Sequence, residues 1–287
     1  MNNRGHKFGG PWTEQKLECV SDYLRAYTTI MNNYTFHFAY IDAFAGMGHR
    51  ELKLESDTAI QRFLAGSARR ALEVEPPFKE YVFIEDNKAS FAELKKLTRE
   101  FPNQNIKCIN MDANKYLADF CQKTEWRTNR ALVFLDPYGM QVEWKTIELI
   151  AQTQAIDLWL LFPIGMSVNR KLKNDAEIGS SERQKLDMLF GGPDWFNEFY
   201  QVKPQLELFS EGEVMEKKDN IFAAIEEYFM GRLQSIFTKV ADNPLPLRNS
   251  KNSLMYQLYF AAGNPKGAST AVKIAQYILS KQLQENI

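Results

Sequence analysis

Five short runs of apolar residues alternate with amphipathic segments along the first 162 residues. This alternation constrains the fold more than any other feature of the chain. The runs are Phe38–Phe44, Tyr81–Ile84, Ile106–Ile109, Ala131–Leu135 and Ile156–Phe162. A continuous apolar run of this length is typical of a strand that is buried on both faces of a parallel sheet. The pattern therefore predicts an α/β fold with a doubly wound, mostly parallel sheet.

The other elements follow from helical periodicity and turn residues. Thr13 is the expected N-cap of the first helix. Residues 235–240 and 254–262 are expected to form an antiparallel edge hairpin, which makes a sheet of seven strands. The expected helices are 13–31, 67–72, 88–100, one through Tyr116 and Phe120, 143–152, 219–235 and 268–284.

The alternation stops after Phe162, which suggests a division of the chain. Residues 1–36 are expected to be an N-terminal helical extension. Residues 37–162 and 218–287 would form the sheet domain. Residues 163–217 show no regular strand period and are expected to be an inserted subdomain on the substrate side.

Charge and composition exclude several classes of protein. Lys and Arg number 35 against 36 Asp and Glu, so bulk positive charge does not hold this chain to nucleic acid. Three dispersed cysteines and three histidines make a zinc site or a disulfide framework improbable, and we expect no metal. No apolar segment has the length of a membrane span or a signal peptide, so we expect a cytoplasmic protein without a membrane partner.

Acidic or glycine-rich segments follow the first four runs, at the expected carboxyl ends of the strands. The first run ends near Asp42 and Phe44, and Gly46 and Gly48 follow. Ligands of open parallel sheets bind at these ends, close to the point where the strand order reverses. Glycine lets backbone amides approach a ligand, although an ordinary strand-to-helix turn explains two glycines equally well.

The second run ends in two adjacent carboxylates, Glu85 and Asp86. A carboxylate at the tip of a second strand can accept hydrogen bonds from both hydroxyls of a ribose. Asp86 or Asn87 would alternatively cap the helix 88–100. Both interpretations can hold together, with Glu85 on the ribose.

The third and fourth runs end in further candidates. Asp112, beside the backbone of Ala113, could accept a hydrogen bond from an adenine amino group. A helix N-cap is the simpler explanation for Asp112 alone. Asp136 and Pro137 follow the fourth run. Asp can accept a hydrogen bond from a substrate amine, the proline carbonyl can accept another, and Tyr138 can stack on a planar base.

Together, these four segments resemble the class I S-adenosylmethionine-dependent methyltransferases. Asp42-Ala-Phe-Ala-Gly-Met-Gly48 is similar to their first motif, and Asp136-Pro-Tyr-Gly139 is similar to the D/N-P-P-Y/F motif of amino-methylating enzymes. The second match has one proline fewer and a shifted tyrosine. The resemblance implies a Rossmann-like methyltransferase sheet and catalytic roles for Asp136, Pro137 and Tyr138. It also implies S-adenosyl-L-methionine as the cofactor, held by Asp42, Phe44, Gly46, Gly48, Glu85, Asp86, Asp112 and Ala113.

More narrowly, nearly the whole chain resembles the bacterial three-Cys-motif partner (TcmP) family. The similarity rests on Y-I-D-A-F-A-G-M-G, F-I-E-D, V-F-L-D-P-Y-G, Phe162-Pro163 with Arg170, and Asn264-Pro-x-Gly267. The family name refers to cysteines of a neighbouring protein. The resemblance therefore implies a partner protein that carries a three-Cys motif.

The expected acceptor is a nucleic-acid base or another amino group. Arg170 and Lys171 form a basic cluster, and residues 239–287 carry six Lys or Arg against two Asp or Glu, an excess of +4. Such cations can follow phosphates, and Trp195 could stack on a base. Ordinary solvated helix faces explain the charges equally well, and the stretch 205–227 is acidic.

Two alternatives to an active methyltransferase stay open. One is a catalytically inactive protein that binds the cofactor and serves as a partner, which the altered Asp136 motif permits. The other is an NAD(P)-dependent oxidoreductase. The gap from Gly48 to Glu85 exceeds the ~20 residues of the dinucleotide fingerprint, which disfavours that class.

Overall fold

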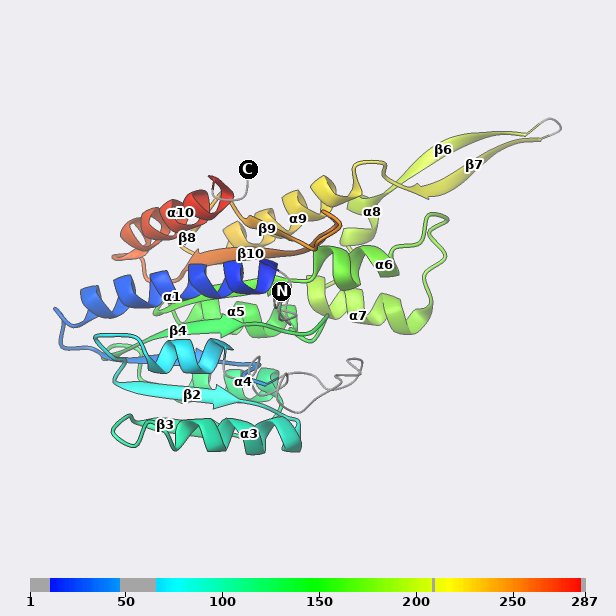
Figure 1. Ribbon diagram of the computed structural model, residues 1–287. Helices are drawn as coiled ribbons and strands as arrows, with labels where there is room; N and C mark the ends of the chain where they lie inside the picture. The colour runs from blue at the N-terminus through cyan, green and yellow to red at the C-terminus, as the bar shows by residue number, and fades with distance from the viewer. Residues whose placement is uncertain (1–10, 47–65, 208–209, 285–287) are drawn as a thin grey trace, which may run out of the picture.

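A central β-sheet lies between two layers of helices (Figure 1). The computed structural model describes residues 11–46, 66–207 and 210–284. The first five strands are all parallel to one another, as the apolar runs predicted. They are β1 (His37–Asp42), β2 (Glu80–Ile84), β3 (Ile106–Ile109), β4 (Asn129–Leu135) and β5 (Ile156–Phe162).

The strand order is β3-β2-β1-β4-β5-β10-β8, so the order reverses between β1 and β4. Strand β10 (Leu254–Ala262) is antiparallel to β5 and also pairs with β8 (Lys239–Val240) and β9 (Leu245–Arg248). The described sheet therefore has eight strands, one more than the seven expected. The expected strand 235–240 is wrong in its first half, because helix α9 continues to Ile236.

One face of the sheet is covered by α1 (Pro11–Met31), the helical residues 66–72, α3 (Lys88–Thr98) and α10 (Ala268–Gln284). The opposite face is covered by α4 (Ala113–Lys123), α5 (Trp144–Gln152) and α9 (Ile221–Ile236). The apolar stripe predicted for the first helix is confirmed, since Leu17, Val20, Leu24 and Tyr27 are buried. Thr13 is not its N-cap, because the helix already includes Pro11.

Residues 163–217 form η1 (Ile164–Val168), α6 (Asn169–Lys171), α7 (Ser180–Phe190), α8 (Trp195–Phe199), β6 (Tyr200–Glu207) and β7 (Ser210–Lys217). The expectation that this segment lacks regular strands is wrong, because β6 and β7 pair as an antiparallel hairpin. The hairpin extends away from the body of the molecule (Figure 1).

The helices of this segment share a hydrophobic core with the sheet. The ring of Phe190 lies 6.1 Å from that of Phe162 on β5 and 6.3 Å from that of Phe229 on α9. The rings of Phe162 and Phe229 stack at 4.0 Å. This packing fixes α7 against the sheet edge that carries the strand ends.

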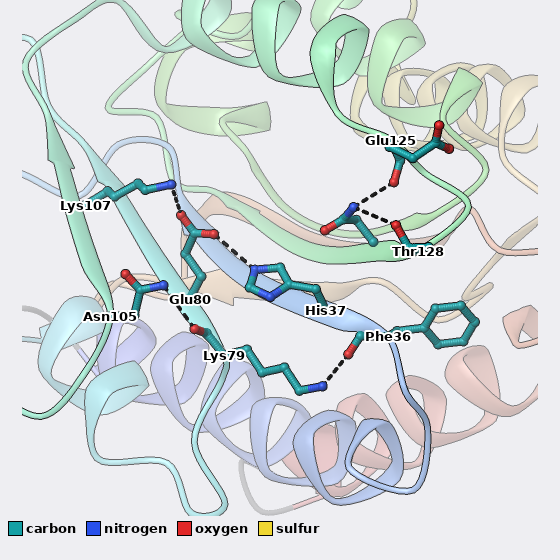
Figure 2. A network of polar contacts seen from close by, with 9 residues as sticks. Phe36, His37, Lys79, Glu80, Asn105, Lys107, Glu125 and Thr128 are labelled. Atoms are coloured by element: carbon teal, nitrogen blue, oxygen red, sulfur yellow. Dashed lines mark hydrogen bonds and ion pairs between the residues drawn. The ribbon is translucent and has the colours of Figure 1, made fainter.

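Polar contacts tie the amino ends of the first strands together (Figure 2). Glu80 on β2 accepts from His37 on β1 at 3.1 Å and pairs with Lys107 on β3. Burial alone would raise the pKa of Glu80, but the interactions with Lys107 and His37 outweigh it and hold the pKa below its usual value. His37 thus has a structural role, at the opposite end of β1 from Asp42.

Within the described ranges, no helix is both long and apolar enough to cross a lipid bilayer. The same residues contain no group of three or more His, Cys, Asp or Glu side chains that could hold a metal ion.

Candidate functional site

The carboxyl ends of β1, β2 and β4 bring three carboxylates to one edge of the sheet. Asp42, the last residue of β1, is in register with Phe83 on β2 and Phe134 on β4. Glu85 and Asp136 each lie two residues beyond those partners. Parallel strands end at the same edge, so the three side chains gather where the strand order reverses.

Asp42 is fully buried, and neither of its carboxylate oxygens has a hydrogen-bond partner among the described residues. The pKa of Asp42 is raised from 3.8 to about 7, chiefly by burial and in part by the charge of Asp136. The hydroxyl of Ser67, the amide of Phe44 and the ammonium of Lys16 oppose this shift, without a well-formed hydrogen bond to Asp42. A buried carboxylate without a partner is costly, which indicates a place for a cationic or hydrogen-bonding ligand.

Glu85 packs directly against the backbone of Gly46. A Cβ atom at Gly46 would overlap with Oε2 of Glu85 and would lie 2.8 Å from Cβ of Ser90. Oε1 of Glu85 accepts a hydrogen bond from the amide of Asn87 at 2.6 Å. Burial raises the pKa of Glu85 to about 7, and the carboxylates of Asp86 and Asp42 act in the same direction.

The segments after β2 and β3 begin with helix caps. Asn87 is the N-cap of α3, because its side chain accepts from the amides of Ala89 and Ser90 at 2.9 and 3.1 Å. The exposed Asp86 is therefore not the cap. The side chain of Asn110 donates to the carbonyls of Glu85 and Asp86 at 2.7 and 3.1 Å and joins the two segments.

Asp112 is the N-cap of α4, since its Oδ1 accepts from the amide of Lys115 at 2.9 Å. The simpler of its two interpretations is thus confirmed. Ala113 is buried beneath it. A role of Asp112 toward an adenine stays a prediction.

Asp136 forms an ion pair with a residue outside the predicted site. Nζ of Lys16, on α1, lies 2.5 Å from Oδ2 of Asp136. The Lys16 side chain is 3% exposed, whereas that of Asp136 is 19% exposed. A signal did exist, because Lys16 has the helical spacing of the buried Val20, Tyr23 and Tyr27 and so lies on the apolar stripe.

Aromatic side chains lie around this ion pair. Nζ of Lys16 lies 5.5 Å from the ring centre of Trp12 and 5.9 Å from that of Phe134. The rings of Trp12 and Tyr256 stack at 5.0 Å. Tyr138, two residues after Asp136, is exposed, while Pro137 is buried.

The predicted acceptor-binding residues have different surroundings. Arg170 is exposed on α6, and its charge acts on the hydroxyl of Tyr256. Nζ of Lys171 is paired with Glu182 at 3.2 Å. Trp195 is fully buried, and its indole donates to Asp187 at 2.7 Å. Trp195 is therefore a core residue in this conformation, and its predicted stacking on a base is wrong.

The remaining predicted residues lie in the first motif. Phe44 is half-buried and packs against the core on the α4 side of the sheet. Gly48 lies outside the described residues, so its predicted contact with the cofactor is not placed.

Comparison with known proteins identifies the fold. No protein-family model and no curated protein sequence matches the chain. A solved structure of a DUF519-family protein from Legionella pneumophila is similar over 96% of this chain and 94% of that one, with a TM-score of 0.51 and 12% identity. At such identity the likeness shows the fold alone.

Two other solved structures are less similar. An S-adenosylmethionine-dependent methyltransferase from Clostridium acetobutylicum aligns over 86% of this chain and 92% of that one, with 11% identity and a TM-score of 0.37. An rRNA methylase from Streptococcus thermophilus aligns over 69% and 93%, with 14% identity and a TM-score of 0.28. The strand order itself defines an α/β protein with a mostly parallel, Rossmann-like sheet and a polar site at the switch point.

Proposed function

We propose that the protein is an S-adenosylmethionine-dependent methyltransferase whose acceptor is a nucleic-acid base or another amino group. One observation carries the proposal. Asp42 is a fully buried carboxylate without a described partner, at the switch point of a doubly wound sheet. A cation with a hydrogen-bonding ammonium group would satisfy both of its oxygens.

The other residues of the site fit the same cofactor. Glu85 directly follows β2, where a carboxylate can accept hydrogen bonds from the hydroxyls of a ribose. Its contact with Gly46 leaves no space for a side chain at position 46. Asp42 would hold the ammonium group, with Phe44, Gly46 and Gly48 beside it. Asp86, Asp112 and Ala113 would bound the ribose and adenine.

Bound S-adenosylmethionine would supply a methyl group on a positively charged sulfur, and the protein supplies orientation. In this proposal, Asp136 accepts a hydrogen bond from the acceptor amine, the Pro137 carbonyl accepts another, and Tyr138 stacks on the acceptor. The exposed Arg170, whose charge acts on Tyr256, would contact a phosphate of the acceptor. Lys171 would do the same after leaving its ion pair with Glu182.

The resemblance to the TcmP family adds a partner protein with a three-Cys motif to the proposal. Residues 163–217 are proposed to contribute acceptor recognition through α6 rather than through Trp195. An inactive cofactor-binding protein remains the second candidate. The observation in its favour is the Lys16–Asp136 ion pair, which engages one oxygen of the proposed catalytic carboxylate.

Transfer of a tritiated methyl group from S-adenosylmethionine tests the activity. The purified protein is incubated with total RNA, denatured DNA and a protein extract in separate reactions, and label is counted in each. We expect label in one nucleic-acid fraction, which Asp136→Ala abolishes. Label in the protein fraction alone would contradict the nucleic-acid acceptor, and binding of the cofactor without any transfer would favour the inactive candidate.

A further inference from the structure

The ion pair between α1 and the segment after β4 is unusual in its surroundings. Lys16 is buried, and its ammonium lies 5.5 Å from the ring centre of Trp12 and 5.9 Å from that of Phe134. A buried ammonium is stable only with a counter-charge, and Oδ2 of Asp136 supplies it at 2.5 Å. Asp42 is the other carboxylate on which the charge of Lys16 acts.

The ion pair determines which kind of amine the carboxylate of Asp136 can bind. Its negative charge is compensated by Lys16 through Oδ2, while the carboxyl group as a whole is 19% exposed. Oδ1 can therefore accept a hydrogen bond from a neutral N–H group. A protonated amine would gain little there, because the site already holds one buried cation of the same sign.

The aromatic side chains near Asp136 favour a flat ligand. Tyr256 is buried and stacks on Trp12, and the exposed Tyr138 stands beside Asp136 in sequence. Burial raises the pKa of Tyr256, electrostatic interactions with Asp136 and Tyr138 add to this, and Arg170 opposes it. Asp136, Tyr138 and Arg170 thus each lie within electrostatic reach of Tyr256. A planar base that carries the amine would stack on the exposed Tyr138, and Arg170 would bind the phosphate of the same nucleotide.

We propose that Lys16 determines acceptor specificity: by compensating Asp136, it makes the site select a neutral amine on a planar base and reject an aliphatic ammonium ion. This inference rests on the proposed function and narrows its acceptor. Lys16 is a positioning residue, because it acts through Asp136 and need not touch the acceptor.

The test is the amine preference of the protein saturated with S-adenosylhomocysteine, which keeps the nucleotide probes out of the cofactor site. Calorimetry measures binding of three probes: adenosine monophosphate, cytidine monophosphate and n-butylammonium. The wild type is expected to bind at least one nucleotide and to bind butylammonium weakly. In Lys16→Met, the nucleotide should bind at least about tenfold more weakly and butylammonium at least about tenfold more tightly, because Asp136 then lacks a counter-charge.

Three variants make the result specific. Lys16→Arg keeps the charge and should keep the wild-type preference. Lys145→Met removes an exposed lysine that pairs with Glu148 on α5, and it should change neither affinity. Lys16→Gln, which keeps a donor to Asp136 without the charge, carries the test if the methionine variant does not fold.

Unchanged butylammonium affinity in Lys16→Met or Lys16→Gln would overturn the inference, as would a wild type that prefers butylammonium. A wild type that does not bind S-adenosylhomocysteine would instead refute the proposed function. A purely structural role for Lys16 predicts a lower unfolding temperature and equal weakening of all probes, which is also a contradiction.

Discussion

Replacing the buried carboxylate of Asp42 with an amide should change how the stability of the empty protein depends on pH. On folding, the pKa of Asp42 rises from 3.8 to about 7 because the side chain is buried. A shift of this size corresponds to about 4 kcal/mol. A group whose pKa is raised contributes stability that is fully present below about pH 4 and is lost as the pH rises through about 7.

Between pH 5 and pH 8, this single group should lower the free energy of unfolding by about 2–3 kcal/mol. Asp42→Asn removes the ionisation but leaves a buried amide, which costs about 1–3 kcal/mol at every pH. The absolute stability of the variant is therefore uninformative, whereas the pH slope is diagnostic. Urea unfolding of the wild type and the variant at half-unit steps from pH 5 to pH 8 measures both.

We expect the stability of Asp42→Asn relative to the wild type to rise by about 2–3 kcal/mol across this range. Asp112→Asn is the matched control, because that residue is an exposed helix cap and asparagine caps equally well. A constant difference between Asp42→Asn and the wild type from pH 5 to pH 8 would refute the reasoning, because Asp42 would then be ionised without cost.

Three further changes have distinct expected outcomes. Gly46→Ala displaces the carboxylate of Glu85, so cofactor affinity should fall at least about tenfold, while unfolding by urea shifts by less than about 2 kcal/mol. Trp195→Phe loses the hydrogen bond of a buried indole and should lower stability by about 1–3 kcal/mol, with cofactor affinity unchanged in a titration. Asp157→Asn keeps an acceptor for the Tyr23 hydroxyl. Because burial raises the pKa of Asp157 to about 6, the variant should gain about 2–2.5 kcal/mol relative to the wild type between pH 4 and pH 7 in urea unfolding.

The parallel strands and the gathering of the carboxylates could be predicted from the sequence because both depend on local apolar runs. The run Ile156–Phe162 has the same bounds as β5, and all seven of its residues are buried. Once the strands are parallel, the residues that follow them must share one edge. The positions of Asp42, Glu85 and Asp136 therefore needed no knowledge of long-range packing.

Features that depend on contacts between distant segments were missed. Lys16 looks like a solvated charge until α1 is placed against the end of β4, where Asp136 compensates it. Trp195 looks available for stacking, but contacts with Phe190 and Phe199 bury it. The prediction for Trp195 failed, and no role was predicted for Lys16, because burial is set by tertiary packing rather than by residue type.

The β6–β7 hairpin was missed for a local reason. Tyr200, Val202 and Leu206 alternate with polar residues, as they do in a strand that is exposed on one face. Pro204 interrupts this alternation and argues against a central strand. In a two-stranded hairpin both strands are edges, so the proline is tolerated at its place opposite Glu213.

Calorimetric titration of S-adenosylmethionine into the protein at pH 7, in two buffers of different ionisation enthalpy, tests the central claim most directly. The account predicts saturable binding at one site and release of about half a proton from Asp42, whose pKa is about 7 in the empty site. Asp42→Asn should release about half a proton less than the wild type, the remainder coming from Glu85, whose pKa is also about 7. Glu85→Ala should weaken binding at least about tenfold. No binding by the wild type, or undiminished binding by both variants, would contradict the account.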